Sequence, residues 1–96
     1  MREFLIRTAA DHGWPALPAE RAAEVLRPAG WAVELAPGAG EPGYRIDGAT
    51  ISCSAEEVGW LVTIDGGPLR ATDWVDRVTL QVGEAVGEPC EWIELT

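Results

Sequence analysis

Lysine is absent from this chain, and histidine and tyrosine occur once each. Side chains that commonly perform acid–base or nucleophilic chemistry are therefore scarce. An enzyme is the least favoured class, although catalysis by carboxylates alone stays open. No spacing of carboxylates in the sequence argues for such catalysis.

Long hydrophobic runs are also absent. The start of the chain has an apolar run of only three residues, Phe4 to Ile6, which is too short for a signal peptide or a membrane span. We therefore expect a cytoplasmic protein with no membrane partner. Cys53 and Cys90 are expected as reduced thiols in that compartment, with a disulfide between them as the minor alternative.

Motifs for metals and cofactors are missing in the same way. One histidine and two distant cysteines do not form a zinc ligand set, and Asp65-Gly66-Gly67 lacks the acidic repeat of a calcium loop. Gly38 to Gly43 matches G-x-G-x-x-G, but a strand is expected after it where a dinucleotide site needs a helix. Glu41 would repel phosphate, and Pro42 has no amide N–H to donate. We therefore expect no metal and no cofactor.

Negative charge is what the chain has in excess. Residues 1–27 hold four acids and four arginines, whereas residues 28–96 hold twelve acids and three arginines, which accounts for the whole net charge of −9. A field of one sign repels nucleic acid and anionic membranes and attracts basic partners. We therefore expect no nucleic-acid partner. The alternative interpretation is that the negative charge only keeps the protein soluble.

The length of 96 residues allows one domain, 1–96, in which residues 1–29 form a helical lead-in to a sheet and a helix over 31–96. Five tryptophans are many for this length, and in so small a domain most of them must lie in the core. Trp14 differs because it lies in a proline-rich connector. It is the candidate for an exposed aromatic contact.

The first third of the chain is expected to be helical. Residues 2–12 predict a short helix that ends at Gly13, with a strand at 4–7 as the competing prediction. The single histidine, His12, would then lie at the negative end of this helix. Residues 18–27 predict a second helix, because they start at a proline and are rich in alanine.

The hydrophobic period then changes to two. Alternating apolar residues predict strands at 31–35, 44–53 and 60–65, and the last of these has apolar residues on both faces, as a central strand does. The apolar parity slips at Asp47-Gly48, which is either a tight hairpin turn or a bulge in one bent strand. The bulge is favoured because the arms of a hairpin would be short. Residues 54–58 are expected to form a turn.

The clearest helix covers residues 73–86, and a last strand follows near Trp92. The resulting order is α-α-β-β-β-α-β, which is an α+β fold. We expect an antiparallel meander sheet with helices packed on one face, where the last helix returns the final strand to the same sheet. The apolar stripe of that helix consists of Trp74, Val75, Val78, Val82, Ala85 and Val86.

These features favour a non-enzymatic interaction domain whose acidic face binds a basic protein partner. One form of this hypothesis is an inhibitor or immunity-type protein that blocks a basic enzyme, with carboxylates standing in for phosphates. The expected state is a monomer or a weak homodimer. The candidate binding residues are Trp14, Glu56, Glu57, Asp65, Glu88, Glu91 and Glu94.

Two alternatives stay open. One is a structural or assembly subunit that forms homo-oligomers, and the other is a small-ligand domain with a tryptophan-lined pocket. The hypothesis of an acidic face requires the candidate acids to gather on one surface of the folded chain. Glu91 and Glu94 already limit it, because they fall on opposite faces of a regular strand.

Overall fold

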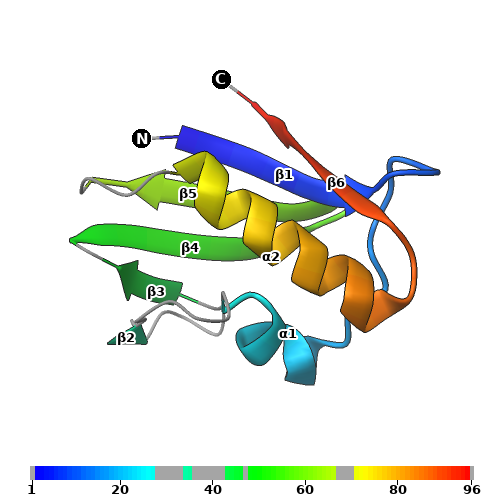
Figure 1. The fold of residues 1–96 in the computed structure, drawn as a ribbon, viewed down its shortest axis with the longest axis horizontal. Coiled ribbons are helices and arrows are strands. Elements are labelled where there is room, and N and C mark those ends of the chain that lie inside the picture. Colours follow the sequence, from blue (N-terminus) through cyan, green and yellow to red (C-terminus); the bar gives the residue numbers. More distant parts are fainter. Residues whose placement is uncertain (1, 28–33, 36–42, 47, 67–70, 96) are drawn as a thin grey trace.

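The structure is a computed structural model that describes residues 2–27, 34–35, 43–46, 48–66 and 71–95. These residues form a six-stranded antiparallel sheet and two helices, which confirms an α+β fold (Figure 1). The strand order in the sheet is β2-β3-β4-β5-β1-β6. The elements are β1 (Arg2–Thr8), α1 (Ala19–Val25), β2 (Glu34–Leu35), β3 (Gly43–Ile46), β4 (Ala49–Glu56), β5 (Gly59–Asp65), α2 (Ala71–Val86) and β6 (Cys90–Glu94).

The chain begins with a strand and not with a helix. β1 lies inside the sheet, paired with β5 on one side and β6 on the other. Phe4 and Ile6 are fully buried on one face of β1, and Leu5 on the other face is only 7% exposed. A strand covered on both faces has a continuous apolar run in place of alternation, so periodicity alone does not distinguish it from a helix. The predicted helix at 2–12 is therefore wrong, and the competing strand is correct.

The predicted helix at 18–27 is confirmed as α1, which begins after Pro18. Proline is well suited to a helix start, because its missing N–H would have no helical partner there. The end of α1 is held by α2. Gln81 Nε2 donates hydrogen bonds of 2.8 Å to the Val25 carbonyl and 2.7 Å to the Arg27 carbonyl, so oxygens that the helix itself leaves open are satisfied.

Residues 44–53 form two strands and not one bent strand. The pair Ile46–Ala49 closes a hairpin between β3 and β4 with two residues between the strands. Gly48 has φ +81°, which such a tight turn requires. The favoured bulge is therefore wrong. The short arm of β3 suffices because β4 also pairs with β5, from Thr50 to Glu56. Residues 31–33 and 36–42, which include most of the G-x-G-x-x-G match, lie outside the described residues.

The turn between β4 and β5 is shorter than expected. β4 continues to Glu56, which lies opposite Gly59 in the ladder, so only two residues connect the strands. Gly59 has φ +150°, and its backbone packs closely on β1. A Cβ added there would lie 2.3 Å from the Ile6 carbonyl oxygen. This contact requires a glycine where β5 approaches β1.

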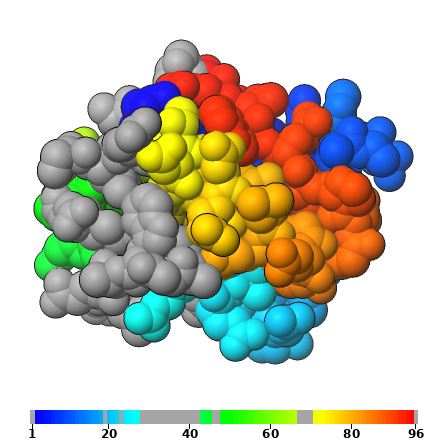
Figure 2. All heavy atoms as spheres, viewed as in Figure 1, coloured from blue at the N-terminus to red at the C-terminus, as the bar shows by residue number. Residues whose placement is uncertain are grey.

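The last helix returns the chain to the sheet, as expected. β5 and β6 both run antiparallel to β1, so they run parallel to each other and need a crossover connection, which α2 supplies. Figures 1 and 2 show α2 crossing one face of the sheet beside β6. Trp74, Val75, Val78 and Val82 are fully buried in the core below it. No helix in the described ranges is long and apolar enough to cross a bilayer.

Candidate functional site

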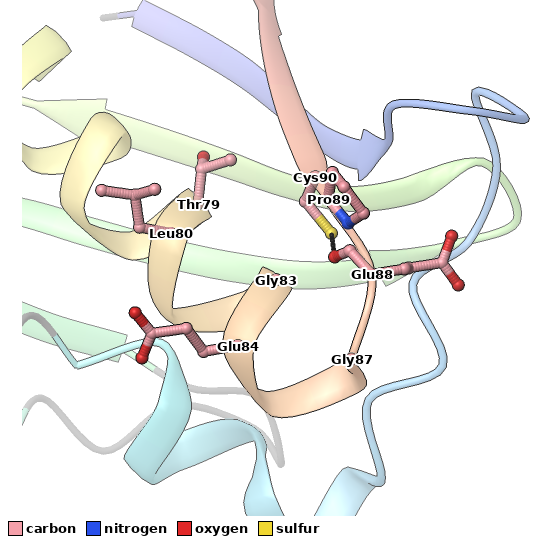
Figure 3. Close-up of a pocket in the computed structure, with 8 residues that line it drawn as sticks. All are labelled: Thr79, Leu80, Gly83, Glu84, Gly87, Glu88, Pro89 and Cys90. Carbon is pink, nitrogen blue, oxygen red and sulfur yellow. Dashed lines mark hydrogen bonds between the residues drawn. The ribbon is translucent and has the colours of Figure 1, made fainter.

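A groove lies between α2 and the edge strand β6 (Figure 3). It consists of two pockets with cavity volumes of about 390 and 490 Å³. Both are lined by Thr79, Leu80 and Cys90, so they adjoin. The first pocket continues toward Pro89 after the end of α2, and the second continues along β6 to Trp92.

One side of α2 lines the groove. Asp76, Thr79, Leu80 and Gly83 recur at the spacing i, i+3, i+4, i+7, which places residues on one side of a helix. Leu80 is 63% exposed, a large apolar side chain left open to solvent. Gly83 allows the following chain to pack closely, because a Cβ there would lie 3.1 Å from the Glu88 carbonyl oxygen.

Thr79 adds a polar atom to the groove. The residue is only 6% exposed, and within the described part of the chain its Oγ1 is buried without a hydrogen-bond partner. Leaving a buried hydroxyl unsatisfied costs about 1–3 kcal/mol.

β6 forms the other wall, and its tryptophan is fixed in place. Trp92 Nε1 donates a hydrogen bond of 2.5 Å to Asp76 Oδ1 across the groove. The ring of Trp92 packs edge-on against Phe4, with centroids 5.4 Å apart and planes at 80°. Contacts to both the helix and the sheet hold this side chain, so the wall is formed before any partner arrives.

Carboxylates lie along the margins of the groove. Asp76, Glu84, Glu88 and Glu91 line it, and no arginine or histidine is among its described lining residues. Asp76 and Glu91 have partners within the chain, whereas Glu84 and Glu88 form no ion pair with any residue that the structure describes. The groove therefore combines apolar walls with uncompensated negative charge.

Glu91 and Glu94, two of the predicted binding residues, connect β6 to β1. Arg7 Nε donates a 2.8 Å hydrogen bond to Glu91, and Arg2 donates to both carboxylate oxygens of Glu94 at 2.8 and 2.9 Å. The bond from Arg2 lowers the pKa of Glu94. The two glutamates lie on opposite faces of β6, as expected from their spacing. Their charges are compensated within the chain.

The other predicted acids do not all gather at one place. Glu56 and Glu57 are exposed at the turn between β4 and β5, whereas Asp65 lies at the opposite end of β5. β4 is separated from β6 by β5 and β1, so about 14 Å of sheet lies between Glu56 and the groove. Of the predicted residues, Glu88 and Glu91 are the two that line the groove together.

His12 and Trp14 lie in the connection between β1 and α1. His12 is not at a helix end, because there is no helix before it; its φ is +52° and its Nε2 is 3.7 Å from Glu91 Oε2. Trp14 is 37% exposed, and its ring stacks on the buried Trp60 with centroids 5.3 Å apart. Trp14 is therefore partly open but does not line the described groove.

The two cysteines are not joined by a disulfide and lie far apart. Cys53 is buried in β4, and Cys90 begins β6. The strands between them separate the two by about 14 Å, which is more than twice the Cα distance that a disulfide can span. The alternative of a disulfide is therefore excluded by this fold.

The thiol of Cys90 should react slowly. Its burial and the negative charge of Glu88 raise its pKa, which lowers the fraction of reactive thiolate at a given pH. We expect iodoacetamide to modify Cys90 more slowly than a cysteine in an unstructured peptide, and Glu88→Gln to speed the reaction and shift its pH profile downward. Mass spectrometry of the digested protein measures both, with the fully buried Cys53 as the unreactive internal control. Equal rates with and without Glu88 would contradict this prediction.

The sequence did not single out most of the groove. Asp76, Leu80 and Gly83 belong to no motif. A usable signal was present nonetheless. Leu80 is a large apolar residue outside the buried stripe of α2, and the small residues Thr79 and Gly83 lie beside it at helical spacing.

Among the residues that the structure places, no group of three or more His, Cys, Asp or Glu side chains is arranged to hold a metal ion. The groove is therefore described by its shape, its exposed leucine and its carboxylates. Comparison of the chain with protein-family models, with curated proteins and with solved structures gives no match, so its function is argued from these residues and their geometry.

Proposed function

We propose that this protein is a non-enzymatic interaction domain that binds a basic protein partner at the groove between α2 and β6. The observation that supports this most is the combination of Glu84 and Glu88, which have no ion-pair partner among the described residues, with the exposed Leu80. A partner that brings arginine or lysine beside an apolar side chain would satisfy all three. Charged margins steer association, and apolar contacts in the centre retain the partner.

An inhibitor or immunity-type protein is the concrete form of this proposal. An enzyme that acts on a polyanion carries a basic site, and a surface of carboxylates competes for that site. The net charge of −9 adds long-range attraction, which raises the association rate and weakens with salt. The expected mechanism is therefore occlusion of a basic surface.

The proposal contains no catalytic step. Cys53 is fully buried, and the raised pKa of Cys90 keeps its thiol protonated. The single histidine lies outside the groove, in the connection after β1. The chemistry that the groove offers is recognition of cationic and apolar side chains.

A pair of double variants tests whether the groove carries the binding. The probe is an oligoarginine of about ten residues, and the measurement is isothermal titration calorimetry at low and high salt. We expect Glu84→Gln with Glu88→Gln to weaken binding about tenfold, because these carboxylates flank the groove. The matched control, Glu56→Gln with Glu57→Gln, removes the same charge at the distant β4–β5 turn and should change binding by about twofold at most.

Equal losses in the two double variants would refute the groove as the site, because binding would then follow total charge. Affinity that does not decline with salt would refute the electrostatic part of the proposal. Both variants replace exposed residues, so the fold should be unaffected, which a thermal melt checks.

A further inference from the structure

β6 is an edge strand with an open backbone. It pairs only with β1 in the described sheet. The Leu95 N–H donates to the Glu3 carbonyl at 2.9 Å, which fixes which pairs of the ladder exchange hydrogen bonds. By the alternation of an antiparallel ladder, the N–H and C=O groups of Trp92 and Glu94 point away from β1. These groups are available to another strand.

The usual protection of an exposed edge is missing along β6. Natural edges carry lysine, proline or free charges that disfavour pairing with another strand. Residues 90–94 contain neither proline nor lysine. β6 carries two charged residues, Glu91 and Glu94. Their carboxylates are paired with Arg7 and Arg2 of β1. The edge is therefore open to strand addition.

The groove lies directly beside this edge. Cys90 and Trp92 belong both to the edge strand and to the groove wall, and Leu80 of α2 lines the same pocket. In a strand, alternate side chains point to the same face. A strand added to β6 would direct every second side chain toward α2, where Leu80 and Thr79 line the groove.

Charge decides which strand fits. A second copy of this chain would bring its own Glu84 and Glu88 toward the same two carboxylates, and like charges facing each other are destabilising. An extended segment with arginine or lysine meets Glu84 and Glu88 with the opposite sign. A helix would leave the backbone groups of Trp92 and Glu94 unpaired.

We propose that an extended basic segment of the partner adds to β6 as a seventh strand and places alternate side chains in the groove. This inference rests on the proposed function and specifies how the partner is held. Backbone hydrogen bonds to the edge supply affinity, and the groove selects the side chains. The apolar side chains contact Leu80 and Trp92, and the cationic ones reach the glutamates at the margins.

A pair of peptides separates strand addition from simple charge attraction. The probe is a capped peptide of about ten residues that alternates arginine and valine, which is the length of a long strand. The control has the same sequence with every backbone nitrogen methylated, so it keeps all charges and side chains but has no N–H to donate. Nuclear magnetic resonance gives the affinity of each peptide and the hydrogen exchange of single amides.

We expect the unmodified peptide to bind and to slow the exchange of the Trp92 and Glu94 amides, and the methylated peptide to bind about tenfold more weakly. Leu80→Arg should weaken binding of the unmodified peptide about tenfold, because it places a cation in the groove. Val58→Arg is the matched control: Val58 is 55% exposed in the β4–β5 turn, and the variant changes the net charge equally. It should alter the affinity by about twofold at most.

Equal binding of the two peptides, without added protection at Trp92 and Glu94, would overturn strand addition and leave the proposed function in place. Equal effects of Leu80→Arg and Val58→Arg would overturn the role of the groove in holding the strand. Failure of both peptides to bind at low salt would overturn the inference and the proposed function together.

Discussion

Replacing Gly59 by alanine should lower the free energy of unfolding by about 4 kcal/mol. The φ of +150° strains any residue with a Cβ, by about 1–3 kcal/mol. The added methyl group would also lie 2.3 Å from the Ile6 carbonyl oxygen and 3.2 Å from Leu5 Cδ1, which is overpacking of about the same cost. β5 and β1 would have to separate, although both are interior strands of the sheet. Urea denaturation followed by tryptophan fluorescence measures the loss.

Gly87→Ala is the matched control for this prediction. Gly87 also has a positive φ, +76°, but a Cβ there would have nothing within 4 Å. The variant carries only the backbone strain and should lose about 1–2 kcal/mol. If the two alanine variants were equally stable, the close approach between β5 and β1 would not be what requires Gly59.

Replacing Trp74 by alanine should cost about 3–5 kcal/mol, because it opens a large cavity in a core that includes both helices and the sheet. Trp74 is fully buried on the stripe of α2. Trp74→Phe should cost less, since it keeps most of the ring and removes an indole N–H that has no hydrogen-bond partner among the described residues. Thermal unfolding by circular dichroism compares the two variants.

Leu80→Ala is the control on the same helix. Leu80 is mostly exposed, so the variant should change stability by about 0.5 kcal/mol or less. A loss as large as that of Trp74→Ala would mean that the groove wall is part of the core. A small loss, which we expect, shows that Leu80 can be varied in binding experiments while the fold persists.

The elements that sequence patterns predict best are those in which one face is buried more completely than the other. The stripe from Trp74 to Val86 on α2 and the alternation at 60–65 on β5 both repeat with a single period, and both are confirmed. β1 shows no such period in its sequence. Its position between two strands buries Phe4 and Ile6 on one face and Leu5 on the other, so the period disappears. That position depends on strands up to ninety residues away, which local patterns cannot show.

The hairpin at Asp47-Gly48 and the groove could not be predicted from the sequence, for a related reason. The change in apolar parity indicated a turn or a bulge, but the choice depended on β4 pairing with β5, which stabilises a short β3. The groove needs residues of α2 and β6 to meet across a crossover. Of the acids predicted from charge, Glu88 and Glu91 reach it, and Asp65 lies at the far end of the sheet. Composition indicates how many carboxylates the chain carries, whereas the fold decides where they lie.

The place of β1 in the sheet has a consequence for how the chain folds. The hairpins β3–β4 and β4–β5 are local, whereas Arg7 meets Glu91, 84 residues away. Non-local pairing must close long loops before it is stabilised, so we expect folding in milliseconds to seconds and not microseconds. During synthesis Phe4, Leu5 and Ile6 emerge before their partner strand β5. Until then, this apolar segment is the part of the nascent chain most prone to aggregate.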